Sequence, residues 1–161
     1  MSNGRISINI ELEGFEEFAD AMAKMPKVLM HNLSKELGYA ALTAERLARQ
    51  LAPRDTGELE DSIHAGAIKR EGGALVTYIG TNMEYAKYVH ELSSNRIGDK
   101  YDKGVKITGY YVDGRGQRTR DKPSIKGYKP GRKYLRNAIV LTEPYLEKAM
   151  NRAIEKTLGG V

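Results

Sequence analysis

The sequence predicts an α+β fold, in which a small antiparallel sheet packs against a long helix and a C-terminal helix, with one long basic loop. Three observations predict it: an alternating apolar segment near the N-terminus, a helical apolar stripe over residues 26–51, and a second such stripe over residues 146–158. A chain of 161 residues fits one domain of ordinary size. We therefore expect a single domain over residues 1–161, in which residues 93–131 form a mobile loop insertion.

The first third of the chain is predicted to hold one strand and two helices. Residues 5–12 alternate between apolar and polar side chains, which is typical of a half-buried strand. Gly14 ends this strand, and a short amphipathic helix is expected over residues 15–22. Pro26 suits the first turn of a longer helix. This helix is expected to end before Pro53, because proline disfavours helical conformation in the residue that precedes it.

A β-hairpin is predicted after a turn at residues 54–57. Its strands cover residues 62–70 and 74–80, and the connection between them contains two glycines. A short helix is expected to follow over residues 82–92. Asn82 is its expected N-cap, since asparagine side chains accept hydrogen bonds from the free N–H groups of a first turn.

Residues 93–131 show no helical stripe and carry seven glycines. Within them, residues 105–108 and 110–112 predict a ragged hairpin. Residues 133–141 then predict a helical turn or a strand. Pro144 suits the first turn of a terminal helix, which is expected to end at a pair of glycines.

Composition excludes several classes of function. The chain has no cysteine, which excludes disulfide scaffolds, thiolate metal sites and thiol nucleophiles. No apolar run approaches the roughly 18 residues of a membrane span, and the first residues lack the apolar core of a signal peptide. We expect a soluble protein, made in a cytoplasm, that does not contact a membrane.

No catalytic residue, metal or cofactor is predicted. Asp55-Thr56-Gly57 matches the tripeptide of aspartic proteases, but it lacks the apolar strands that such a site needs. A capping box formed by Asp55 and Glu58 is the better interpretation. Neither a nucleophile elbow nor a phosphate-binding loop is present. The chain has three histidines without ligand-like spacing: His31, His64 and His90. We therefore expect a protein that is not an enzyme.

Positive charge is confined to one part of the chain. Residues 1–92 carry 10 Lys and Arg against 14 Asp and Glu, whereas residues 93–136 carry 13 against 4, a net charge of +9. This excess favours contact with the phosphates of a nucleic acid. A solvated loop and docking on an acidic neighbouring subunit are the alternatives. The residues expected to face DNA are Lys100, Lys103, Lys106, Arg115, Arg118, Arg120, Lys122, Lys126, Lys129, Arg132 and Lys133.

Three segments together resemble the head–tail joining family of long-tailed bacteriophages, whose members are neck, tail-completion or minor tail proteins. The first is Ala52-Pro53-Arg54-Asp55-Thr56-Gly57-Glu58-Leu59 with Ser62-Ile63; the second is Tyr78-Ile79-Gly80 followed by Tyr85-Ala86-Lys87-Tyr88-Val89-His90-Glu91; the third is Arg132-Lys133-Tyr134-Leu135-Arg136-Asn137-Ala138. The residues to which the resemblance gives a structural role are Pro53, Asp55, Thr56, Gly57, Leu59, Ser62, Tyr85, Ala86, Tyr88 and Glu91. Gly57 is expected to adopt a backbone conformation that other residues avoid.

The resemblance implies a structural virion protein, found in phages and prophages, that is assembled in the host bacterial cytoplasm. It would form a homo-oligomeric ring, a hexamer or a dodecamer, between a portal-side connector and a tail-tube or tail-terminator protein. DNA would pass through this ring at the virion neck and contact it without sequence specificity. The chain departs from the family pattern at Leu92-Ser93, where Gly-Thr is usual, and at Lys133-Tyr134, where Pro-Phe is usual. The alternatives are a DNA-binding module of a mobile element that uses residues 93–136, and a homo-oligomeric assembly factor that does not contact DNA.

Overall fold

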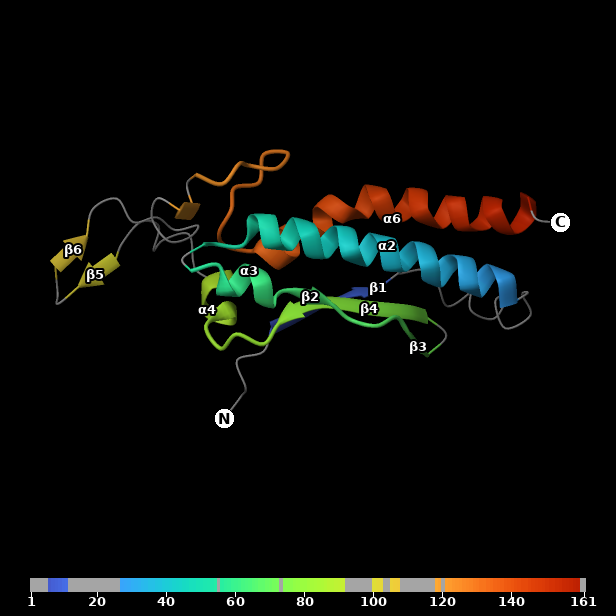
Figure 1. Cartoon of the computed structure of the whole chain (residues 1–161), viewed down its shortest axis with the longest axis horizontal. Helices are drawn as coiled ribbons and strands as arrows, with labels where there is room; N and C mark the ends of the chain where they lie inside the picture. The colour runs from blue at the N-terminus through green and yellow to red at the C-terminus, as the bar shows by residue number, and fades with distance from the viewer. Residues whose placement is uncertain are drawn as a thin grey trace.

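The computed structural model confirms the α+β class (Figure 1). It describes residues 6–11, 27–54, 56–72, 74–91, 100–102, 105–107, 118–119 and 121–159. The helix expected over residues 15–22 lies outside these residues. No helix in the described part of the chain is long and apolar enough to cross a membrane.

The sheet is small, antiparallel and centred on β4 (Ala74–Thr81). On one side β4 pairs with β1 (Ile6–Glu11), with Ile8 opposite Ile79. On its other side β4 pairs with β2 (His64–Ala65) and then with β3 (Lys69–Glu71). The predicted hairpin is therefore confirmed, although its first strand is broken into two pieces.

The break between β2 and β3 lies at Gly66, where the backbone passes very close to the ring of Tyr78. The Gly66 N–H still donates to the Tyr78 carbonyl oxygen at 2.8 Å. However, a Cβ atom at this position would lie 2.0 Å from Cε1 of the Tyr78 ring. Only glycine allows the backbone to pass so near the ring.

Two long helices, α2 (Lys27–Leu51) and α6 (Tyr134–Gly159), lie side by side in opposite directions and cover the sheet (Figure 1). The prediction for α2 is confirmed within one residue at each end. The prediction for α6 was wrong at its start, because α6 begins at Tyr134 and Pro144 lies within it. Pro144 cannot donate to the carbonyl of Val140, but both residues are exposed, so water can reach that oxygen. Buried residues of α6 lie on both sides of Pro144 and keep the helix continuous.

The core consists of two hydrophobic clusters along the α2–α6 pair. The larger one surrounds the end of α2 and the beginning of α6, and includes Leu51, Ile79 and Leu135. The smaller one lies towards the other end of the pair, where Leu33 and Leu37 meet Leu75 of β4. Both clusters contact the partly buried Leu146 of α6, so this residue connects them.

Two short helices differ from the prediction. Helix α3 (Glu58–Ser62) was not predicted, and its N-cap is Gly57. The predicted capping box depends on Asp55, which lies outside the described residues. Gly57 has φ +100°, which confirms the expected special conformation. Helix α4 (Ala86–His90) begins later than predicted, and its N-cap is Tyr85 rather than Asn82.

The basic residues 93–136 also differ in part from the prediction. Two short strands, β5 (Lys100–Asp102) and β6 (Val105–Ile107), pair with each other. The predicted hairpin placed residues 105–108 against residues 110–112 instead, and the latter lie outside the described residues. Residues 121–131, which belong to the predicted long loop, make hydrogen bonds to the end of α2, as described below.

Candidate functional site

The three motif segments, residues 52–63, 78–91 and 132–138, meet at the C-terminal end of α2. Helices α3 and α4 and the first turn of α6 gather around this end in Figure 1. Each segment supplies buried residues to the larger hydrophobic cluster: Ala52, Leu59, Ile63, Ile79, Ala86, Tyr134, Leu135 and Ala138. Segments that are far apart in the sequence therefore form one packed structure.

A buried lysine closes the end of α2. Lys122 Nζ donates to the carbonyl oxygen of Arg49 at 3.0 Å and to that of Ala52. It also lies 3.0 Å from Oε1 of Glu60 on α3, and its side chain is only 6% exposed. The last carbonyl oxygens of a helix have no partner within the helix and carry partial negative charge, so an ammonium group is well suited to bind them.

Glu60 also receives a second cation. Arg54 donates to it through Nε at 2.6 Å and Nη2 at 2.8 Å, one bond to each carboxylate oxygen. Burial alone would raise the pKa of the Glu60 carboxyl, but the hydrogen bonds from Arg54 and Lys122 outweigh it and hold the pKa below its usual value. Burial lowers the pKa of the Lys122 ammonium, and Glu60 opposes that effect.

Two further hydrogen bonds attach the residues around Lys122 to the first motif and to the last residue of α2. The Arg54 N–H donates to the hydroxyl of Thr119 at 3.0 Å, and the Gly131 N–H donates to the carbonyl of Leu51 at 2.7 Å. We call residues 121–131 the closing segment. Within it, Ile125 and Tyr128 exchange two backbone hydrogen bonds of 2.9 Å across a two-residue turn. The central residues of this turn both have positive φ, as in type I′ turns.

The second and third motifs contact each other through His90. Its Nδ1 lies 2.6 Å from Oε1 of Glu91, and its ring meets that of Tyr134 edge to face at 5.2 Å between centroids. The Nε2 atom of His90 is buried and has no hydrogen-bond partner among the described residues. Burial lowers the pKa of His90, an effect that Glu91 opposes and that Lys133 and Arg132 reinforce. The histidine is therefore neutral at pH 7.

Lys133 explains one departure from the family pattern. Its φ is +56°, and its backbone N–H donates to the carbonyl of His90 at 3.0 Å. A proline could not replace it in this structure, because proline has no N–H and its φ is fixed near −65°. The Lys133 ammonium also pairs with Glu91. Lys133 thus connects the second and third motifs through its backbone and its side chain.

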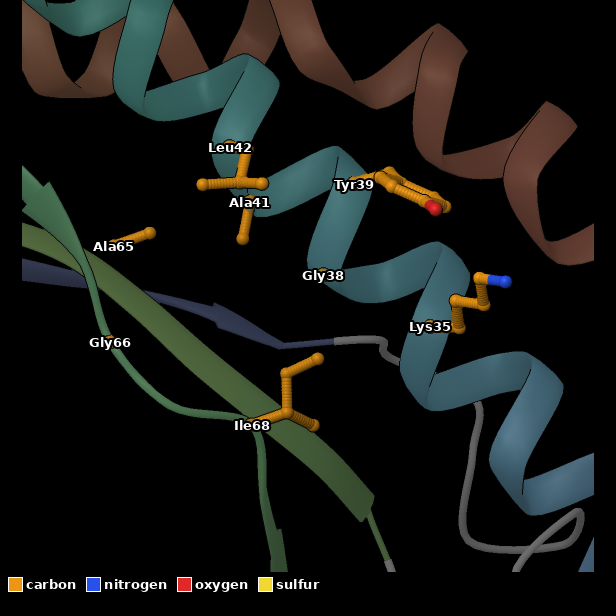
Figure 2. A pocket seen from close by; sticks show the side chains of 8 residues that line it. All are labelled: Lys35, Gly38, Tyr39, Ala41, Leu42, Ala65, Gly66 and Ile68. Atoms are coloured by element: carbon orange, nitrogen blue, oxygen red, sulfur yellow. The ribbon is translucent and has the colours of Figure 1, made fainter.

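A separate groove lies between α2 and the broken edge of the sheet (Figure 2). It encloses about 390 Å³ and is mostly apolar. Its walls are five residues of α2 and three from the segment around the strand break: Lys35, Gly38, Tyr39, Ala41, Leu42, Ala65, Gly66 and Ile68.

A protein-family model matches the part of the chain that contains the first motif and nearly all of the second. Residues 16–90 match a family model described as "Bacteriophage HK97-gp10, putative tail-component". The chain is similar to the HK97-gp10-like family. The resemblance found in the sequence is thereby confirmed, and the match supports a structural role as a phage tail component within a virion. No curated protein and no solved structure matches the chain.

The structure separates the predicted DNA-facing residues into groups. Arg118, Lys126 and Lys129 are exposed, whereas Arg132 and Lys133 are half-buried. Lys100 and Lys106 lie on the paired strands β5 and β6. Lys103, Arg115 and Arg120 lie outside the described residues. The assignment of Lys122 to a DNA-facing surface was wrong, because its ammonium is buried on carbonyl and carboxylate oxygens of the same chain.

The residues to which the resemblance gives a structural role are mostly buried or paired. Pro53, Leu59 and Ala86 are buried, and the hydroxyl of Ser62 lies 2.5 Å from that of Thr81. Thr56 and Tyr85 are exposed, and Glu91 pairs with Lys133. Tyr88 lies within α4, and Asp55 lies outside the described residues.

Neither the Lys122–Glu60–Arg54 cluster nor the groove was predicted from the sequence. Most of the bonds of Lys122 are to backbone carbonyls, which have no signature in the sequence. The groove could have been suspected from the sequence, because the apolar side chains of Tyr39 and Leu42 interrupt the polar face of α2. In the described residues, no group of three or more histidine, aspartate or glutamate side chains could hold a metal ion.

Proposed function

We propose that this protein is a structural component of the neck of a tailed phage. It forms a ring that joins the portal or connector to the tail, completes the tail, and lines the channel through which DNA passes. The observation that carries this proposal is the match of residues 16–90 to a phage tail-component family. The third motif and the closing segment extend the matched region into one packed body.

The surface of the described residues is consistent with a subunit of an assembly. Seven large apolar side chains are exposed in the described part of the chain, and six of them lie on α2 or α6. Such side chains gain free energy when a neighbouring protein covers them. Ring formation requires contacts of this kind on two different faces of each subunit.

The proposed channel lining uses residues 93–136, which we call the basic segment. A ring repeats each exposed cation around its axis, so the exposed part of the net charge of +9 over residues 93–136 becomes a collar of positive charge. Lys126 and Lys129 of the closing segment are exposed, and Lys126 Nζ lies over the Tyr145 ring of α6 at 5.5 Å from its centroid. Ile125 and Tyr128 attach this segment to the larger hydrophobic cluster, to which the motifs also contribute. Contacts of lysine with phosphates hold DNA without reading its sequence.

Assembly with purified phage parts tests this proposal. Native mass spectrometry of the protein alone should show a closed oligomer, a hexamer or a dodecamer. Electron microscopy of the protein mixed with tail tubes, or with DNA-filled heads that carry their connector, should show it at the joining end. The proposal is overturned if the protein binds neither tails nor heads. Salt-dependent binding to free DNA by a monomer would support the alternative, a DNA-binding module of a mobile element.

A further inference from the structure

One face of α2 is exposed although it carries apolar side chains. Val28, Tyr39 and Leu42 are 57%, 53% and 58% exposed, and Lys35 and Arg46 lie on the same face at helical spacing. We call these five residues the α2 stripe. Tyr39, Leu42 and Lys35 also form one wall of the groove in Figure 2. The α2 stripe and the groove are therefore one continuous surface.

The outward face of α6 has a related pattern with the opposite charge. Val140 and Leu158 are exposed, Leu158 by 68%, and three exposed carboxylates lie along the same side of the helix. We call this set the α6 stripe: Val140, Glu143, Glu147, Glu155 and Leu158. The α2 and α6 stripes cannot meet within one chain, because the two helices already pack together through their other faces.

We propose that the α2 stripe and groove of one copy bind the α6 stripe of a second copy. This inference rests on the proposed ring and names the contact that would build it. Lys35 and Arg46 are opposite in sign to the carboxylates of the α6 stripe, and β3 beside the groove carries the exposed Lys69, Arg70 and Glu71, a net charge of +1. Apolar residues of each stripe then cover those of the other. Leu158 is the side chain best placed to enter the groove, because it projects from the last turn of α6.

The hydrogen bonds at the groove favour a helix over an added strand as the occupant. An incoming strand would need free backbone groups on the edge formed by β2 and β3. However, the Ala65 N–H donates to the side chain of Glu45 on α2 at 2.7 Å, and the Gly66 N–H already pairs with Tyr78. Strand addition is blocked at these positions. The groove instead offers apolar surface to side chains.

A contact between two different faces has a geometric consequence. Each copy that binds through its α2 stripe leaves its α6 stripe free for the next copy. Such a heterologous contact continues from copy to copy and closes into a ring when the rotation per step permits. The same surfaces therefore supply both contacts of every subunit.

Paired variants of the full chain test the inference. Leu42→Asp disables the α2 stripe, and Leu158→Asp disables the α6 stripe; both positions are exposed, so the fold should tolerate them. Each variant alone should be monomeric by native mass spectrometry, with association weakened at least tenfold. An equimolar mixture should give a dimer, because one intact stripe of each kind remains. Tyr145→Asp is the matched control, since Tyr145 is exposed on a different side of α6, and it should assemble as the wild type does.

Charge exchange gives a second test. Lys35→Glu with Arg46→Glu, or Glu147→Lys with Glu155→Lys, should each prevent assembly. Mixing the two double variants should restore an oligomer in which they alternate, because one kind of contact then has exchanged charges and the other has wild-type charges. The inference is overturned if either apolar variant still forms the wild-type oligomer, or if both mixtures remain monomeric. Binding of wild-type protein to tails or heads while these variants assemble normally would overturn the inference alone. If the variants fail to assemble as expected but the wild type binds neither tails nor heads, the proposed function alone is overturned.

Discussion

The ammonium of Lys122 lies 3.0 Å from the carboxylate of Glu60, although 62 residues separate them in the sequence. This contact joins the basic residues 93–136 to the first motif segment, residues 52–63. Because Lys122 also binds the carbonyl oxygens of Arg49 and Ala52, it closes α2 at the point where Pro53 ends the helix. Part of the positive charge that suggested DNA contact thus has an internal role.

Replacing Lys122 with methionine should destabilise the fold. The change leaves two buried carbonyl oxygens without their donor, while Arg54 still neutralises Glu60. Loss of such buried bonds costs about 2–4 kcal/mol of unfolding free energy, which urea denaturation can measure. Lys129→Met is the control, because Lys129 is exposed and should change stability by less than about 0.5 kcal/mol. Equal stability of the two variants would contradict the internal role of Lys122.

Replacing Gly57 with alanine should destabilise the turn before α3. Gly57 has φ +100°, and apart from its chain neighbours no atom of the described residues lies within 4 Å of the position of a Cβ. The cost therefore arises from backbone strain and not from a clash, and should be about 1–3 kcal/mol. Gly38→Ala is the matched control: Gly38 lies within α2, where a Cβ would meet only ordinary contact with Ile68. That variant should gain about 0.5–1 kcal/mol. Thermal unfolding of both should show shifts of opposite sign.

His90 should make stability depend on pH near neutrality. Burial lowers its pKa in the folded protein below the ordinary value of 6.5. As pH falls through 6.5, the unfolded chain gains a proton that the folded chain does not take, so stability decreases until the folded pKa is reached. The slope is at most about 1.4 kcal/mol per pH unit. His90→Phe retains the contact with the Tyr134 ring and removes the titrating group. Urea midpoints between pH 7.5 and 5.5 should fall in the wild type and change less in the variant. An unchanged slope in the variant would exclude His90 as its source.

The elements predicted correctly are those whose signals are local. The apolar spacing of α2 and the position of Pro53 determined that helix, and Gly57 marked a turn that needs positive φ. Pro144 misled the prediction, because a proline in a first turn and a proline within a packed helix look alike in the sequence. The packing of α6 on both sides of Pro144 decides between them, and this packing depends on the distant helix α2.

The candidate site was predictable only in outline. The motifs identified Leu59, Ala86 and the neighbourhood of Tyr134 as important, but not that they share one hydrophobic cluster. The role of Lys122 could not be predicted, since a count of charge does not distinguish a buried lysine from an exposed one. The positive φ of Lys133 was likewise hidden, because lysine rarely adopts it and the sequence offers no glycine there.

The exposed lysines of the closing segment provide the sharpest test of the proposed DNA contact. Lys126→Gln with Lys129→Gln removes two exposed charges and leaves Lys122 in place. If the ring holds DNA through phosphates, the logarithm of the binding constant falls linearly with that of salt concentration, with a slope of about 0.9 for each phosphate neutralised. The double variant should therefore lower that slope by up to about 2, equally for unrelated DNA sequences, without a change in oligomeric mass.

Lys87→Gln with Lys148→Gln is the control, because it removes the same charge from exposed positions outside the basic segment and should leave the slope nearly unchanged. Identical slopes for the wild type and both double variants would exclude the closing segment from DNA contact. Loss of the oligomer in the first variant would instead place these lysines between subunits.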